Sequence, residues 1–192
     1  MEPLNLALFE WIGAGHAPDP WALWFASAVA RHAAWLCVAL MGWAAWRRPT
    51  QRAYVMAILV AAVLAAMLAH ALADAIDMPR PFVLGLSPRY IAHGARGSLP
   101  SAHACVMFTV ALAFLMRPAL RDLGLAITAI AVLTGWARIY VGVHFPLDII
   151  AGLALAGVMT AAIWALGRLA RRFGVPIVAR DDLQTGSSTS PR

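Results

Sequence analysis

Residues 54–75, YVMAILVAAVLAAMLAHALADA, are an apolar run of 22 residues that contains one acidic residue, Asp74, and no arginine. A helix needs about 20 predominantly apolar residues to cross the roughly 30 Å hydrocarbon core of a bilayer. The length and composition of this run therefore predict a membrane-spanning helix.

Four more apolar runs lie between charged residues, at 21–46, 102–116, 123–143 and 145–166. The run at 102–116 would give a helix of only about 22 Å, so we expect one of its ends to lie below the membrane surface. Residues 4–15 have apolar side chains at helical spacing but include Glu10, which predicts a helix lying along the interface. The fold expected is an all-α polytopic membrane bundle with about five spans and an N-terminal interfacial helix.

The overall composition agrees with a membrane protein. Of the 192 residues, 62% are hydrophobic and 12% are charged, which excludes an ordinary soluble domain, a disordered chain and a fibrous repeat. The length predicts one domain, over residues 1–180. The Ser-, Thr- and Gly-rich segment 181–192 is expected to be a disordered tail.

Every one of the 15 basic residues is an arginine, and against nine acidic residues they give a net charge of +6. A basic excess can indicate nucleic-acid binding, but here the arginines lie between apolar runs and indicate topology instead. Five spans place three arginine groups on one side, which we interpret as cytoplasmic: Arg47, Arg48 and Arg52; Arg117 and Arg121; Arg168, Arg171 and Arg172. The N-terminus, the loop 76–101 and the turn near His144 then face the other side, which in a bacterium is the periplasm. No nucleic-acid partner is expected.

Three polar clusters lie at span ends on this second face. They read DMPRPF at 77–82, GSLPSAH at 97–103 and ARIYVGVHFPLD at 137–148. Ionisable residues are costly to bury without a partner, so each cluster calls for a functional explanation. Because the topology places all three on one face, we expect them to meet.

The second and third clusters predict an anion site beside an oriented histidine. Ser101 is a good N-cap, which would leave the first amides of the following helix free beside His103. A helix that begins at Pro146 places Asp148 in its first turn, where its carboxylate reaches back to His144. Such a carboxylate fixes the tautomer of the ring and makes its other nitrogen a better nucleophile.

Two arginines complete the set. Arg80 and Arg138 carry planar guanidinium groups that match phosphate oxygens. The combination indicates phosphoryl transfer without a metal, because one carboxylate and two histidines beside arginines form a poor cation site. No cofactor is expected.

These residues resemble the type-2 phosphatidic acid phosphatase (PAP2) superfamily of membrane lipid phosphatases. The family pattern is a lysine, six residues and Arg-Pro; then Pro-Ser-Gly-His; then Ser-Arg, five residues, His, three residues and Asp. The chain matches it with Arg80-Pro81, with Pro100-Ser101-Ala102-His103, and with Arg138, His144 and Asp148 at the same spacing. The third motif is long and highly specific, whereas the first alone would be weak.

The resemblance implies a role for each matching residue. His144 would attack phosphorus to form a phosphohistidine, Asp148 would orient His144, and His103 would protonate the leaving oxygen. The residues that would hold the phosphate are Arg80, Ser101, the amide of Ala102, and Arg138.

Three positions depart from the pattern: Ala73 replaces the lysine, Ala102 the glycine and Ala137 the serine. The first matters most, since it removes a phosphate-binding cation. Three residues could fill the gap, namely His70 on the same helical face, or Arg89 or Arg96 from the long loop.

The function expected is removal of the terminal phosphate of undecaprenyl diphosphate at the periplasmic face of a bacterial inner membrane, by analogy with small bacterial undecaprenyl-diphosphatases of this superfamily. Phosphatidate, phosphatidylglycerol phosphate or lipid A 1-phosphate are alternative substrates. A catalytically inactive binder or transporter of lipid phosphates is the rival from another class, and Ala73 is what motivates it. The partners expected are the lipid substrate and the bilayer.

Three further polar residues lie outside these motifs and are not assigned a catalytic role. His16 and His93 are expected to be surface residues without a role. Arg31 falls inside the first span, and two interpretations stay open: it faces the bundle and touches a lipid phosphate, or the span begins later and is tilted.

Overall fold

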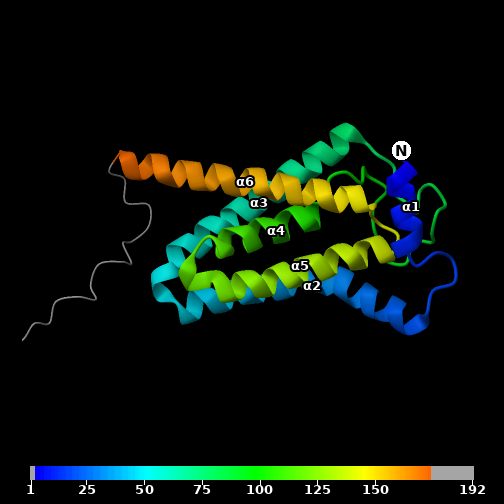
Figure 1. Cartoon of the computed structure of the whole chain (residues 1–192), viewed down its shortest axis with the longest axis horizontal. Coiled ribbons are helices and arrows are strands. Elements are labelled where there is room, and N and C mark those ends of the chain that lie inside the picture. The colour runs from blue at the N-terminus through cyan, green and yellow to red at the C-terminus, as the bar shows by residue number, and fades with distance from the viewer. Residues whose placement is uncertain (1–2, 174–192) are drawn as a thin grey trace, which may run out of the picture.

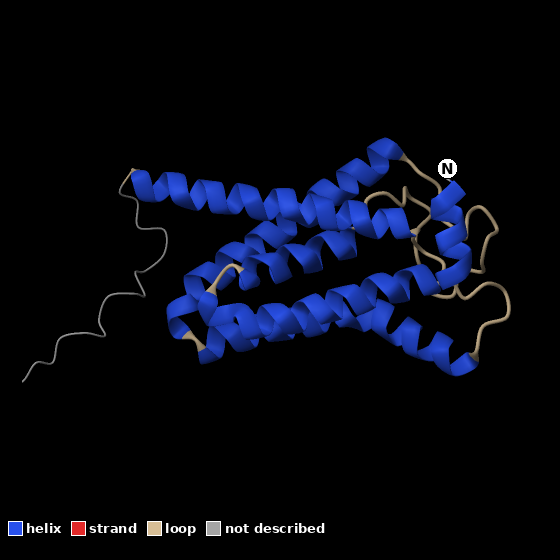
Figure 2. Ribbon diagram, in the orientation of Figure 1, coloured by secondary structure: helices blue, strands red, loops and turns tan. Residues whose placement is uncertain are grey.

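The computed structural model describes residues 3–173, and every regular element in that range is a helix (Figure 2). The elements in chain order are α1 (Pro3–Ile12), α2 (Pro20–Arg47), η1 (Pro49–Gln51), α3 (Arg52–Ile76), α4 (Ala102–Leu115), η2 (Pro118–Leu120), α5 (Arg121–Tyr140) and α6 (Pro146–Arg172). The all-α bundle expected from the sequence is confirmed. Residues 181–192, expected to be a disordered tail, lie outside the described residues.

Helix α4 is the centre of the bundle. It packs against α3, α5 and α6, while α2 covers α5 (Figure 1). A small residue permits one of these close crossings, because a Cβ atom at Gly152 of α6 would lie 2.7 Å from the carbonyl oxygen of Ser101 and 2.9 Å from Cβ of Ala104. The start of α4 is therefore held directly against α6.

Within residues 3–173, four helical segments are long and apolar enough to cross a membrane: α2, η1 together with α3, η2 together with α5, and α6. The fifth apolar helix, α4, has 14 residues, or about 21 Å of helix, as the short run in the sequence predicted. Figure 1 shows its first turn lying short of the end that α5 reaches. The space in front of the N-terminus of α4 is where the loop 77–101 folds inward.

Helix α1 lies across the end of the bundle instead of running along it (Figure 1). Phe9 packs edge-on against Phe145, with ring centroids 5.2 Å apart. Oδ1 of Asn5 accepts a hydrogen bond from the amide of Leu147 at 3.0 Å, in the first turn of α6. The helix predicted to lie along the interface therefore also supports the beginning of α6.

The open question about Arg31 is partly answered by α2. The side chain is exposed and its Nε donates to the carbonyl oxygen of Ser27 at 3.0 Å, so the interpretation that it faces the bundle is wrong. The helix already begins at Pro20 and has 28 residues, about 42 Å, which exceeds the roughly 30 Å hydrocarbon core. A membrane-crossing part that begins inside the helix stays a prediction.

Candidate active site

The turn between α5 and α6 presents an oriented histidine. Nδ1 of His144 lies 3.2 Å from Oδ2 of Asp148, and the same oxygen accepts the amide of Phe145 at 2.8 Å. Both side chains are buried, with 2% of His144 and none of Asp148 exposed. Because a carboxylate oxygen only accepts, the ring proton lies on Nδ1 and the lone pair on Nε2 faces the site.

Arg80 is fixed by three carbonyl groups. Its Nε donates to Arg96 at 2.8 Å, Nη2 to Gly97 at 2.9 Å and Nη1 to Val143 at 2.8 Å. Nη1 also lies 3.3 Å from Nε2 of His144. The first motif and the third motif therefore meet at the free nitrogen of the candidate nucleophile.

Arg138 lies in the last turn of α5 and is 2% exposed. Its Nη1 donates to the carbonyl oxygen of Ala30 at 3.3 Å, and Nη2 lies 2.8 Å from Nε2 of His93. Nε is buried and has no hydrogen-bond partner in the part of the chain that the structure describes. Since a buried donor without a partner is costly, this N–H is available for an oxygen of a ligand.

The beginning of α4 provides backbone donors. Ser101 is the N-cap, and its Oγ accepts the amide of Ala104 at 3.5 Å. The amide of Ser101 itself donates to the carbonyl oxygen of Asp148 at 3.0 Å, which joins the second motif to the third. The amides of Ala102 and His103 belong to the first turn, where a helix offers no internal acceptor, so they can serve an anion.

The His103 ring is partly buried and lies close enough to Arg80, Arg138 and His93 to interact with them electrostatically. The structure thus brings together all the side chains that the sequence selected: His144, Asp148, His103, Arg80, Ser101 and Arg138. They come from a loop, a turn and three helices at one end of the bundle (Figure 1).

The charge state of His144 suits a nucleophile. Burial lowers its pKa well below 6.5, and the nearby positive charges of Arg138 and Arg80 lower it further. The ring is therefore neutral at pH 7 and keeps the lone pair that attack on phosphorus requires.

The expectation that His93 is a surface residue is wrong. The side chain is half-buried, and its ring lies edge-on to that of His144 with centroids 6.0 Å apart. A signal was present in the sequence: His93 lies in a loop tethered at both ends by site motifs, at Arg80 and at Ser101, so the loop cannot move far from the site. His16, by contrast, is exposed as expected.

Two other contributors were not selected individually from the sequence, although Ser98 lies in the polar cluster at 97–103. Ser98 is fully buried and lies close enough to Asp148 to act on its carboxylate electrostatically, although its hydroxyl makes no hydrogen bond within residues 3–173. Asn5 reaches the first turn of α6 from a helix 142 residues earlier in the chain. Both contacts depend on tertiary packing that a single motif does not encode.

At position 73, where the family pattern has a lysine, the backbone of the loop before α4 packs directly against the helix. Ala73 is buried, and a Cβ atom at Gly97 would lie 1.9 Å from its carbonyl oxygen. Of the three suggested replacements, Arg96 lies 3.8 Å from Asp74, and Arg89 donates to the carbonyl oxygen of His93 at 3.1 Å. His70 is exposed and acts electrostatically on His93 and His103.

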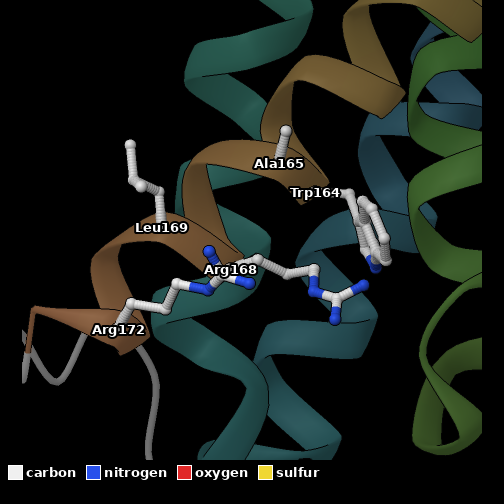
Figure 3. Close-up of a pocket in the computed structure, with 5 residues that line it drawn as sticks. All are labelled: Trp164, Ala165, Arg168, Leu169 and Arg172. Carbon is white, nitrogen blue, oxygen red and sulfur yellow. The ribbon is translucent and has the colours of Figure 1, made fainter.

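No group of three or more His, Cys, Asp or Glu residues suited to a metal occurs within residues 3–173. A shallow pocket far from the site, at the other end of α6, is shown in Figure 3; there Arg168 lies over the ring of Trp164 at 4.6 Å. Eighteen residues of helix, about 27 Å, separate it from Pro146, so it plays no part in the chemistry at His144.

Comparison with known proteins identifies relatives over most of the chain. The sequence model of the PAP2 superfamily matches residues 54–172. A protein from Escherichia coli (strain K12) named "Putative undecaprenyl-diphosphatase YbjG" is 35% identical over 161 residues, which are 83% of this chain and 80% of the relative. The undecaprenyl-diphosphatase BcrC of Bacillus subtilis (strain 168) is 34% identical over 102 residues, 53% of this chain and 51% of the relative.

A solved structure has the same architecture. The crystal structure of LpxE from Aquifex aeolicus superposes with a TM-score of 0.70 at 26% sequence identity, covering 85% of this chain and 96% of that chain. The helices that hold the candidate site are therefore arranged as in a protein with a known structure.

Proposed function

Because the chain belongs to the PAP2 superfamily and is a membrane phosphatase, we propose that it removes the terminal phosphate of undecaprenyl diphosphate. The observation that carries the chemistry is the His144 ring, held by Asp148 through Nδ1 and directed by Nε2 at Arg80. The substrate rests on the relatives: YbjG matches over about four fifths of both chains and BcrC over about half, and both names refer to undecaprenyl diphosphate.

In the first step, Nε2 of His144 attacks the terminal phosphorus. An N–P bond forms, and the bond from phosphorus to the bridging oxygen breaks. His103 donates a proton to that oxygen, which leaves as undecaprenyl phosphate. General acid catalysis of this kind contributes about 10²–10⁴-fold.

The phosphate is held by donors on all sides during this transfer. Arg80 and Arg138 contribute guanidinium N–H groups, and the N-terminus of α4 contributes the amide of Ala102 and the hydroxyl of Ser101. Arg80 is fixed before substrate arrives, because the loop and turn carbonyls hold its guanidinium group in place. In the second step, water attacks the phosphorus of the phosphohistidine and gives a proton back to His103, an O–P bond forms, the N–P bond breaks, and inorganic phosphate leaves with His144 restored.

We further propose that the site faces the periplasm of a bacterial inner membrane. The support is the distribution of arginine: Arg48, Arg117 and Arg121 lie at the end of the bundle opposite His144, and loops rich in arginine stay cytoplasmic. Labelling of single cysteines placed at Ala95 and at Thr50 with a membrane-impermeant reagent in intact cells tests this. Reaction at Ala95→Cys alone supports the proposal, and reaction at Thr50→Cys alone contradicts it.

Phosphate release by the detergent-purified protein tests the activity. The substrates are undecaprenyl diphosphate, phosphatidate, phosphatidylglycerol phosphate and lipid A 1-phosphate at equal concentration. We expect undecaprenyl diphosphate to give the highest kcat/KM, the His144→Ala variant to lose turnover, and His16→Gln, altered at an exposed position on the same side, to keep it.

Two outcomes contradict the proposal in different ways. A higher kcat/KM for another lipid changes the substrate while leaving the chemistry. Lipid binding without turnover in the wild type would instead favour an inactive binder. Retention of turnover in EDTA supports the metal-independent mechanism, and its loss contradicts that mechanism.

A further inference from the structure

His93 makes the closest side-chain contact to a phosphate-binding candidate, although no motif includes it. Its Nε2 lies 2.8 Å from Nη2 of Arg138, and its ring meets that of His144 at an interplanar angle of 82°. The residue belongs to the loop between α3 and α4, which also supplies Arg80. His93 therefore lies between a candidate phosphate ligand and the candidate nucleophile.

The hydrogen bonds fix the tautomer of the ring. A guanidinium group has donors only, so Nε2 of His93 must accept the bond from Arg138. The proton then lies on Nδ1, which donates to the carbonyl oxygen of Gly94 at 3.1 Å. A neutral imidazole thus presents its lone pair to Arg138, which is a candidate phosphate ligand.

The groups around His93 are cations or other imidazoles. They come from every element packed against it: Arg138 from α5, Arg80 from its own loop, His70 from α3, His103 from α4 and His144 from the turn. Arg89 binds the main-chain carbonyl of His93. Burial, together with Arg80, Arg138 and His70, lowers the pKa of His93 to about 4.

A bound phosphate anion would shift the protonation equilibrium of His93 toward the cationic form. Its negative charge between Arg138 and the ring favours a cationic imidazole, and its oxygens accept a hydrogen bond from a protonated Nε2. The site also lacks one cation relative to the family pattern, because Ala73 occupies the lysine position. Of the residues that could replace it, Arg96 is exposed and lies 3.8 Å from Asp74, and Arg89 donates to the main-chain carbonyl of His93.

We propose that His93 is a further phosphate-binding residue, whose ring releases Arg138 when substrate enters, takes up one proton from solvent on Nε2 and donates it to a phosphate oxygen. The imidazolium supplies the positive charge that position 73 lacks. Binding of the anion therefore consumes a proton. The inference rests on the proposed function, since it assumes that a phosphate occupies this site.

Inorganic phosphate is the probe, and its binding to the full-length protein in detergent is measured by calorimetry between pH 6 and 8.5. His93→Gln keeps an acceptor for Arg138 but cannot take up a proton. We expect it to weaken phosphate binding by about 10- to 100-fold at pH 6, the range for loss of one charge-assisted hydrogen bond. The pH dependence of log Kd should also be shallower than in wild type, by up to about one unit per pH unit.

Two variants accompany it. His16→Gln, exposed on the same side of the bundle, should match wild type in affinity and pH dependence. His93→Arg restores a permanent cation, so it should recover much of the affinity while keeping the shallow pH dependence. Thermal unfolding midpoints at pH 8 establish that each variant is folded.

Different results would overturn the assignment of His93 and the proposed function. Wild-type affinity and pH dependence in His93→Gln would overturn the proposal. Tighter phosphate binding in a third variant, His93→Ala, would also overturn it. That result would mean that the ring only competes with phosphate for Arg138 and does not bind phosphate itself. Since binding is measured without turnover, failure of the wild type to hydrolyse any lipid phosphate would overturn the proposed function, not the assignment of His93.

Discussion

The two ends of the bundle use arginine in opposite ways. At the end that holds His144, Arg80 is 6% exposed and Arg138 is 2% exposed, and both donate to main-chain carbonyl groups inside the protein. At the other end, the Arg48 side chain is 30% exposed and pairs with Asp122, while Nε of Arg121 donates to the carbonyl oxygen of Leu115 at the end of α4, at 3.2 Å.

The difference shows where positive charge has a function beyond topology. An exposed arginine at a helix C-terminus is solvated and interacts favourably with the helix dipole, so its position costs little. A buried arginine loses its hydration, and carbonyl dipoles compensate only in part. Burial of two such cations next to a neutral histidine is costly unless an anion completes the site, which is the condition that a phosphatase meets in each catalytic cycle.

The largest expected contrast comes from replacing one arginine at each end by lysine. Arg80→Lys replaces three separate nitrogen donors by a single ammonium nitrogen that cannot match the positions of all three, and each carbonyl group left without a donor costs about 1–3 kcal/mol. It also removes a fixed donor to the transferred phosphate, so turnover should fall by roughly 10²–10³-fold.

Arg121→Lys is the matched control, and its free energy of unfolding should stay within about 0.5 kcal/mol of wild type. Phosphate release and chemical denaturation in detergent measure both effects. Equal losses in the two variants would mean that the buried and exposed arginines do not differ in function.

A pair of glycines tests the same contrast through the backbone. A Cβ atom at Gly97 would lie 1.9 Å from the carbonyl oxygen of Ala73, so Gly97→Ala must displace the loop and its bond to Arg80. We expect a loss of about 1–3 kcal/mol in the free energy of unfolding and a marked loss of turnover.

Gly42 lies near the C-terminal end of α2, at the end of the bundle opposite the site. A Cβ atom added there would have no other atom within 4 Å. Gly42→Ala should therefore stabilise the protein by about 0.5–1 kcal/mol through helix propensity, without affecting turnover. Normal turnover in Gly97→Ala would show that the loop tolerates displacement and that its contacts to Arg80 do not position the site.

Acid should weaken the end that holds the histidines. The pKa of His93 is lowered from 6.5 to about 4, and burial lowers that of His144 as well. Between these pH values the unfolded chain binds more protons than the folded one, so the free energy of unfolding falls as the pH drops from 6.5 toward 4. His93→Gln should make this decline shallower when unfolding midpoints are measured across the range.

The smallest effect is expected at the exposed ion pair between Arg48 and Asp122. The Asp122 side chain is 63% exposed, so a double-mutant cycle with alanine at both positions should give about 0.2–1 kcal/mol, reduced further by salt. A coupling energy of several kcal/mol would show that this end depends on charge pairing as strongly as the site does.

The helices could be predicted from sequence with small errors in their ends. The run at 54–75 became α3, which is Arg52–Ile76, because apolar length alone decides a membrane span. The fourth span was expected to extend to residue 143, but α5 ends at Tyr140, since Gly142 adopts a positive φ of 75°. Apolar residues at 141 and 143 hid this turn, and a glycine alone does not reveal its φ.

The site could be predicted where it depends on local spacing. The pairing of His144 with Asp148 follows from four residues of separation across a helix start, and the N-cap at Ser101 follows from its residue type. His93, Ser98 and Asn5 could not be assigned in this way, because each reaches the site from a segment whose position depends on long-range packing.

The sequence by itself determined that the chain is a helical membrane protein, and it predicted which residues would carry the chemistry, because hydropathy and short-range spacing are local properties. Only the tertiary structure decided how the loop 77–101 folds over the recessed start of α4. That folding buries Arg80 among three carbonyl groups and places His93 on Arg138. Contacts of this kind depend on the distance between segments far apart in the chain, which only the packing of the helices fixes.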